Sequence, residues 1–60
     1  MPSDETRRLL KLFGVAVTNL EDAIDGKKPM DEIMKWDQEL ADRTREVIAH
    51  VEKLRSRRIG

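Results

Sequence analysis

The sequence predicts an all-α protein: an antiparallel two-helix hairpin that a second copy completes as a four-helix bundle. Two segments with apolar residues at helical spacing are separated by one short cluster of Gly and Pro, between Asp25 and Pro29. The chain has 60 residues and no cysteine. So short a chain buries only about 60% of the surface that it exposes when unfolded, and disulfides cannot compensate. We therefore expect a single helical-hairpin domain, residues 1–60, that gains stability by self-association.

The first helix is expected over about residues 4–25. Ser3 can cap its N-terminus, and Asp4 and Glu5 follow in the first turn, where carboxylates oppose the positive end of the helix dipole. Gly26 is expected to end the helix in a left-handed conformation. The apolar residues of this segment form one stripe, made of Leu9, Phe13, Ala16, Val17, Leu20, Ala23 and Ile24, with Leu10 and Leu12 beside it.

The second helix is expected over about residues 29–57, after a turn at about residues 26–28, with Pro29 at its first position. Its apolar residues share one face: Met30, Ile33, Met34, Leu40, Ala41, Val47, Ile48, Val51 and Leu54. Asp37 and Thr44 interrupt that face. A buried Asp37 would need a partner and could fix the register of a dimer, whereas at the rim it would be hydrated. The short turn makes the helices antiparallel, with residue i facing about residue 54 minus i.

Both apolar stripes require a covering partner, because each helix of a hairpin covers the other on one side only. We expect a homodimer, with docking onto a larger protein as a further use of the same residues. Trp36 either packs inside the bundle or anchors that partner. The residues expected at the dimer or partner interface are Leu9, Phe13, Leu20, Ile24, Ile33, Trp36, Leu40, Val47, Val51 and Leu54.

The charges balance overall but not along the hairpin. Twelve basic and twelve acidic residues give a net charge of zero, which argues against a general nucleic-acid or membrane-surface binder. In the hairpin, the end away from the turn is net positive and the turn end is net negative, which favours antiparallel packing of two copies. A basic cluster could contact phosphates, although the chain lacks aromatic residues for base stacking. Its members are Lys53, Arg55, Arg57 and Arg58.

No residue pattern for catalysis, cofactor binding or a metal site is found, so we expect no enzyme. There is no Cys nucleophile, no glycine-rich phosphate loop and no paired-His spacing. The only histidine, His50, either pairs with Glu46 four residues earlier or acts as a proton switch or a metal ligand between subunits.

The sequence also predicts a soluble, cytoplasmic protein with no membrane partner. Its longest apolar run, Leu12 to Val17, contains Gly14 and is much shorter than the about 20 residues that span a bilayer. The first five residues show neither the basic nor the apolar region of a signal peptide.

Two resemblances bear on function. In length and hairpin plan the chain is similar to the small RNA-binding proteins that control plasmid copy number and dimerise as paired hairpins. The segment Leu20 to Leu54 also resembles the small subunit of exonuclease VII, in that Gly26, Pro29, Asp31 and Glu32 follow an acidic helix end. No motif is shared, so no residue role is carried over. We expect a protein–protein interaction module, a regulator or accessory subunit, and the alternative is a nucleic-acid-binding hairpin dimer that uses its basic end.

Overall fold

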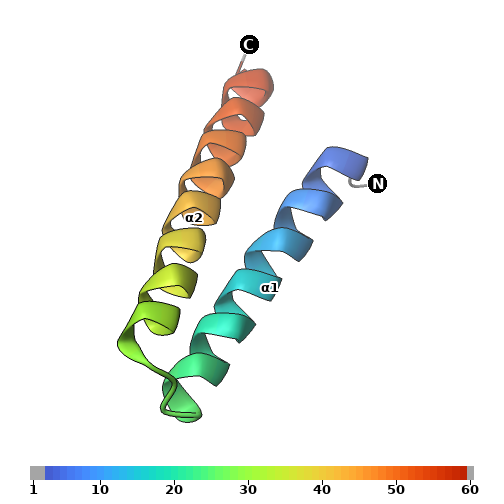
Figure 1. Cartoon of the computed structure of the whole chain (residues 1–60). Helices are drawn as coiled ribbons and strands as arrows, with labels where there is room; N and C mark the ends of the chain where they lie inside the picture. The colour runs from blue at the N-terminus through green and yellow to red at the C-terminus, as the bar shows by residue number, and fades with distance from the viewer. Residues whose placement is uncertain (1–2, 60) are drawn as a thin grey trace.

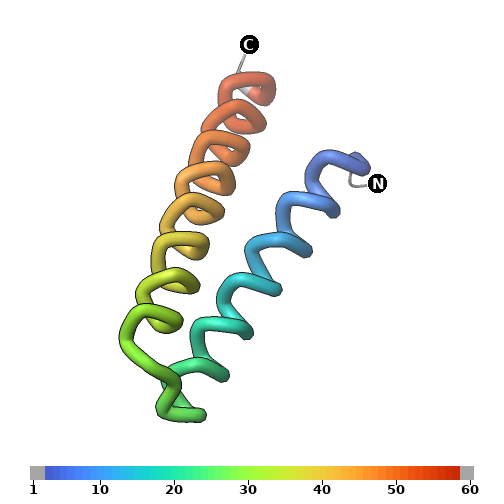
Figure 2. The backbone as a smooth tube through the Cα atoms, in the orientation of Figure 1, coloured from blue at the N-terminus to red at the C-terminus, as the bar shows by residue number. Residues whose placement is uncertain are grey.

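The computed structural model describes residues 3–59, and the side chains of residues 3–58, as two α-helices joined by one tight turn (Figure 1). Helix α1 spans Asp4–Asp25 and helix α2 spans Met30–Ile59. They run antiparallel and side by side, so that the start of α1 lies beside the second half of α2 (Figures 1 and 2). Residues 3–59 contain no strand. The prediction of an all-α helical hairpin is confirmed.

Helix α1 begins as its sequence predicts. Ser3 has an extended backbone, with φ −71° and ψ 163°, and its Oγ accepts a hydrogen bond of 3.1 Å from the Thr6 N–H. Asp4 and Glu5 occupy the first turn. The cap therefore satisfies a backbone donor that has no partner within the helix, and the two carboxylates oppose the helix dipole.

The turn differs from the prediction in which residue is left-handed. Gly26 has φ −81°, and the left-handed residue is Lys27, with φ 52°. The Lys27 N–H donates to the Ile24 carbonyl at 3.1 Å, and the Lys28 N–H donates to the Ala23 carbonyl at 3.0 Å. This is the Schellman pattern of helix ends. The expectation of a left-handed Gly26 was wrong, because Gly26 still bonds back into the last turn of α1 and the reversal falls one residue later.

Helix α2 begins one residue later than predicted. Pro29 precedes the helix, and its carbonyl accepts from the N–H groups of Glu32 at 3.0 Å and Ile33 at 3.1 Å. Pro29 is therefore the cap, and the expectation that it is the first helical residue was wrong. The helix continues to Ile59, past the expected end at about residue 57, and it has 30 residues against 22 in α1. Its last turns extend beyond the start of α1 (Figure 1).

The seam between the helices is narrow. Ala16 and Ala23 of α1 are 2% and 4% exposed, and no larger side chain among residues 3–58 is buried. Small residues let two helices approach closely, but they bury little surface. The half-buried residues around them are mainly Thr6, Leu9, Phe13 and Leu20 of α1 and Ile33, Trp36, Leu40, Thr44, Val47 and His50 of α2.

The register of the hairpin is set two residues away from the prediction. The Thr6 hydroxyl lies 2.8 Å from Nε2 of His50, so residue i faces about residue 56 minus i. For any residue of one helix, this rule therefore gives the residue of the other helix that lies at the same level, meaning the same height along the hairpin.

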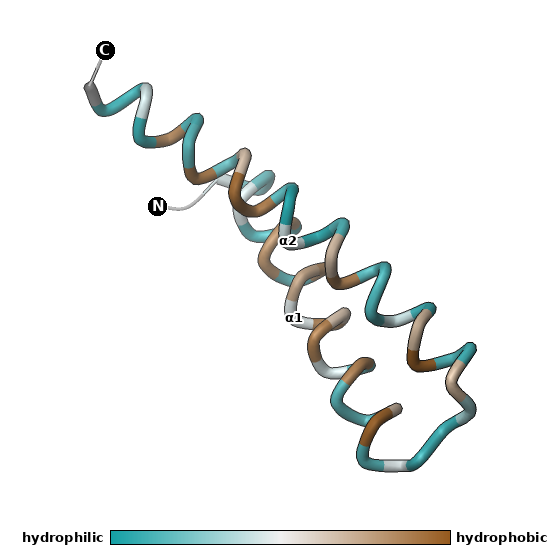
Figure 3. Tube along the Cα trace, turned by 90° about the vertical axis from the view of Figure 1, so that its left-hand side faces the viewer, coloured by the Kyte–Doolittle hydropathy of each residue, from teal (hydrophilic) through white to brown (hydrophobic). Residues whose placement is uncertain are grey.

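The molecule is elongated and exposes a large surface area for its size. Its extents are 47 × 18 × 13 Å, and its radius of gyration is 14.2 Å, whereas a compact domain of this length has about 10 Å. Its accessible surface is 5087 Å², against about 4,000 Å² for a compact protein of the same mass. Apolar segments recur along the full length of both helices, and the turn is hydrophilic (Figure 3). The hairpin thus exposes roughly 1,000 Å² more than a compact monomer would.

Candidate interaction surface

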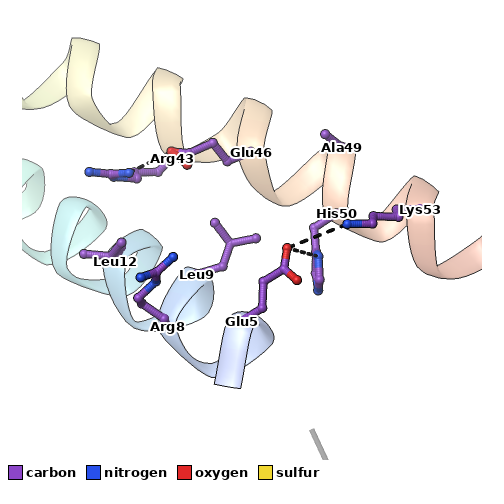
Figure 4. Close-up of a pocket in the computed structure, with 9 residues that line it drawn as sticks. All are labelled: Glu5, Arg8, Leu9, Leu12, Arg43, Glu46, Ala49, His50 and Lys53. Carbon is purple, nitrogen blue, oxygen red and sulfur yellow. Dashed lines mark hydrogen bonds and ion pairs between the residues drawn. The ribbon is translucent and has the colours of Figure 1, made fainter. Parts of the chain in front are cut away.

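One side of the hairpin, which we call the groove side, carries a groove of about 480 Å³ between the start of α1 and the second half of α2 (Figure 4). Leu9 and Leu12 contribute apolar side chains to it, and charged residues surround them. The groove is lined by Glu5, Arg8, Leu9, Leu12, Arg43, Glu46, Ala49, His50 and Lys53.

His50 connects the two helices on the groove side. Its side chain is 11% exposed, and its Nε2 lies within hydrogen-bond distance of the Thr6 hydroxyl. Its Nδ1 lies 3.8 Å from Oε1 of Glu5, and Nζ of Lys53 lies 3.9 Å from the same oxygen. The expected pairing of His50 with Glu46 was wrong, because the imidazole reaches across the seam to α1. The histidine acts as a polar contact between the helices.

Arg43 neutralises two carboxylates on the same side. Its Nη1 lies 2.8 Å from Glu46, and its Nη2 lies 3.0 Å from Glu39. The hydrogen bond to Glu46, together with the negative charge of Glu39, raises the pKa of the Arg43 guanidinium. Arg43, Glu39 and Glu46 therefore pair with one another within the chain.

A second groove, of about 230 Å³, lies nearer the turn on the same side. Trp36 lines it together with Asn19, Asp22 and Lys28. The indole is half-buried, and Nζ of Lys35 lies 5.4 Å from the ring centroid, which is a cation–π distance. Trp36 thus packs at the seam with one edge toward the groove.

The opposite side carries large apolar side chains that stay exposed, and we call it the open face. At about 100° per residue, these positions lie past the seam, away from both grooves. Their exposed fractions run from 39% at Val17 to 67% at Met30. The open face consists of Leu10, Val17 and Ile24 of α1 and Met30, Met34, Ile48 and Val51 of α2.

Two charged residues share the open face on α2. Asp37 and Arg55 are both exposed, and neither forms an ion pair with any residue between 3 and 58. Thr44 lies between them, and its hydroxyl donates to the Leu40 carbonyl at 2.7 Å, so its own helix satisfies it. In a single hairpin the Asp37 side chain is exposed to water, which agrees with the interpretation that places it at the rim of the apolar face.

The residues predicted at the interface divide into two groups. Most are half-buried at the seam: Leu9, Phe13, Leu20, Ile33, Trp36, Leu40 and Val47. Ile24 and Val51 are exposed on the open face, and Leu54 is exposed on the extension of α2. The apolar stripes predicted from the sequence include Val17, Met30, Met34 and Ile48, with Leu10 beside one, but none of these residues was assigned to the interface. Their offset from the centre of each stripe is the signal that identifies them.

The predicted phosphate-contacting residues lie together on the last turns of α2. Lys53, Arg55, Arg57 and Arg58 are all exposed. Only Lys53 lies near a carboxylate, that of Glu5, among the residues whose side chains are described. The structure thus brings these cations to one end of the hairpin.

The described part of the chain shows neither a metal-binding cluster nor a helix suited to cross a bilayer. No group of three or more His, Asp or Glu side chains there could hold a metal ion. Neither α1 nor α2, over residues 3–59, has the length and apolar character needed to cross a bilayer. No protein-family model matches the chain, and neither a curated protein nor a solved structure is significantly similar to it.

Proposed function

We propose that this chain is a small non-enzymatic interaction module, a regulator or accessory subunit, that self-associates through its open face into a dimeric four-helix bundle. The observation that supports this most directly is a contrast in burial. Seven large apolar side chains are exposed on one side, while Ala16 and Ala23 are the only buried residues among residues 3–58. Several large apolar side chains exposed on one side of a protein are typical of an interaction site.

The size of the exposed surface fits one further subunit. The hairpin exposes roughly 1,000 Å² more than a compact protein of its mass. A standard protein interface buries about 800 Å² on each partner. Covering the open face with another hairpin would therefore bring the exposed area of each chain close to that of an ordinary globular protein.

The groove side is the less suitable side for self-association. Arg43, Glu46 and Glu5 would lose water there on contact with an apolar surface, and the desolvation of charges is costly. The open face has few charges to desolvate. A dimer formed through it leaves both groove sides free for a second protein.

Sedimentation equilibrium at micromolar concentration tests the proposal. We expect a dimer of about 14 kDa, twice the 7.0 kDa chain. Its melting temperature should rise by about 5 °C for each tenfold increase in concentration, because dissociation accompanies unfolding. A monomer at all concentrations that melts cooperatively would contradict the proposal.

Two matched variants localise the interface. Val17→Lys places a charge on the open face, and we expect its dimer dissociation constant to rise by about 100-fold or more. Val15→Lys makes the same change two residues earlier on the outer side of α1, where the side chain is also exposed, at 49%. It should leave the dimer intact. Equal effects of the two variants would argue against the open face.

Nucleic-acid binding is the second candidate, and the exposed basic residues of the α2 extension favour it. Arg57 and Arg58 have no ion pair among the described side chains. Fluorescence anisotropy with labelled RNA and DNA at low salt tests this candidate, since phosphate binding is strongest there. Binding that is lost in the double variant Arg57→Glu, Arg58→Glu would support it. No change in anisotropy with either nucleic acid would contradict it.

A further inference from the structure

We infer that the second copy docks on the open face in an antiparallel orientation, with Asp37 of each chain opposite Arg55 of the other. This inference rests on the proposed self-association and specifies its geometry. In this arrangement α2 lies against the partner's α2, and α1 lies against the partner's α1.

The first argument is the position of the two charges. Asp37 and Arg55 are 18 residues apart, which is five full turns at 3.6 residues per turn. They therefore lie on the same line along α2, separated by about 27 Å. This line runs through the open face, beside Ile48 and Val51. When two copies of α2 pack antiparallel along this line, the unpaired acid of each copy can lie opposite the unpaired base of the other.

A two-fold axis perpendicular to the helices makes both contacts at once. If the axis crosses α2 at the level of residue 46, midway between the two charges, Asp37 meets the partner's Arg55. The symmetry then brings Arg55 to the partner's Asp37. By the register of the hairpin, Leu10 of α1 lies at this same level. Leu10 is 54% exposed and would meet its own counterpart at the axis.

The alternative two-fold axis, parallel to the helices, produces like-charge contacts. It places α2 against the partner's α1 with the two turns at the same end. Glu21 of α1 is exposed at about the level of Asp37, so the two carboxylates would face each other across the interface. Like charges in a partly desolvated interface disfavour that packing.

The ends of the hairpin favour the same orientation. Acidic residues outnumber basic ones near the turn, where Asp25, Asp31 and Glu32 lie, and basic residues predominate on the last turns of α2. With the axis at residue 46, the extension of α2 lies against the partner's α2 near Met34. The antiparallel dimer thus covers helical turns that α1 does not reach.

A charge exchange tests the contact. Asp37→Arg and Arg55→Asp should each raise the dimer dissociation constant by at least tenfold, since each places like charges together twice. The double variant should return to within about threefold of the wild type, because the contact is restored with its polarity reversed. Arg57→Asp is the matched control: it makes the same change two residues along, on the groove side, and should have little effect. Far-UV circular dichroism verifies that each hairpin stays helical.

Disulfide trapping tests the orientation of the two chains independently. Because the chain has no cysteine, only the introduced cysteines can form a disulfide. Mixed Asp37→Cys and Arg55→Cys chains should form a heterodimeric disulfide. Mixed Asp37→Cys and Glu21→Cys chains should not. Trapping of the second pair, with no rescue by the charge exchange, would overturn this inference and leave the proposed self-association standing. A monomeric wild type in sedimentation would overturn both.

Discussion

The groove side and the open face are built from the same two helices, yet they treat polar and apolar groups in opposite ways. On the groove side, Arg43 contacts Glu39 and Glu46, and His50 contacts Thr6. On the open face, neither Asp37 nor Arg55 forms an ion pair with the residues described. The apolar residues around them are largely exposed. The groove side thus pairs Arg43 and His50 within the chain, whereas the open face leaves Asp37 and Arg55 without an ion-pair partner among the described side chains.

This difference predicts how mutations on each side depend on protein concentration. A contact made within one hairpin contributes the same free energy at any concentration. A contact made between hairpins contributes through mass action, and its effect changes with concentration.

A substitution in the shared seam should have the largest effect, because both sides depend on it. Ala16 is almost completely buried where the helices approach each other. Ala16→Leu adds three carbon atoms there and should lower the free energy of unfolding by about 1–3 kcal/mol, because the helices are forced apart. Thermal melts followed by circular dichroism measure the loss, and sedimentation should show weaker association as well.

Val15→Leu is the control for this prediction. It enlarges the neighbouring side chain on the outer side of α1, where 49% of the residue is exposed. The expected change is within about 0.5 kcal/mol. If Ala16→Leu were tolerated equally well, the close approach of the helices at this position would be contradicted.

The general plan of the seam is predictable from the sequence. Ser3, Asp4 and Glu5 indicate where α1 begins, and the cluster from Asp25 to Pro29 indicates the reversal. These signals are local, because caps and turns depend on a few neighbouring residues. The apolar periodicity then selects the face that each helix presents to the other, which is why stripe residues such as Leu9, Phe13 and Leu40 are half-buried at the seam.

The register of the hairpin, and the division of apolar residues between seam and open face, are not determined by local sequence. A helical wheel shows a stripe, but it does not show which edge of the stripe the partner helix covers. Phe13 and Val17 both belong to the predicted stripe of α1, yet Phe13 is half-buried and Val17 is exposed. The contact between Thr6 and His50, 44 residues apart, likewise depends on the packed helices. Such features follow from packing of the two elements together.

Loss of the hydrogen bond between Thr6 and His50 should have a moderate effect that does not depend on concentration. Thr6→Val keeps the shape of the side chain and removes the hydroxyl that lies 2.8 Å from Nε2. We expect a loss of about 1 kcal/mol in the free energy of unfolding, because the imidazole is left without this partner. Melts at two concentrations that differ tenfold should show the same loss.

Thr18→Val is the matched control. The Thr18 hydroxyl is exposed and donates to the Gly14 carbonyl of its own helix at 2.9 Å. Its removal therefore breaks no contact between the two helices. Its effect should stay within about 0.5 kcal/mol. A concentration-dependent loss in Thr6→Val would contradict the view that the groove side is satisfied within one chain.

The turn should respond with a smaller change that is opposite in sign. Lys27 is left-handed, with φ 52°, a conformation that costs about 1–2 kcal/mol for a residue with a side chain. Lys27→Gly removes that cost but adds chain entropy to the unfolded state, so the net stabilisation should be about 0.5–1 kcal/mol. The dimer dissociation constant should not change, because the turn lies outside both sides.

Gly26→Ala provides the contrast at the neighbouring position. A Cβ at residue 26 would lie 3.0 Å from the carbonyl oxygen of Asp22, which is backbone and cannot move freely. This variant should be less stable than the wild type. Stabilisation by Gly26→Ala together with destabilisation by Lys27→Gly would contradict the assignment of the left-handed residue.

The smallest effect is expected on the outer side of α2, away from both the groove side and the open face. Hydrogen bonds from Arg45, at 2.8 Å, and from Gln38 lower the pKa of Asp42 from its ordinary value of 3.8. A lowered pKa in the folded state means that this carboxylate stabilises the hairpin above its ordinary pKa, and that the contribution is lost as the pH falls through the lowered value. Asp42→Asn should therefore be slightly less stable than the wild type at neutral pH, and the difference should disappear in acid. The same small difference should be found in the Val17→Lys background, because the contact lies within one helix. A difference present only in the dimeric protein would show that the outer side of α2 also takes part in association, and the contrast between a self-satisfied and an incomplete side would no longer hold.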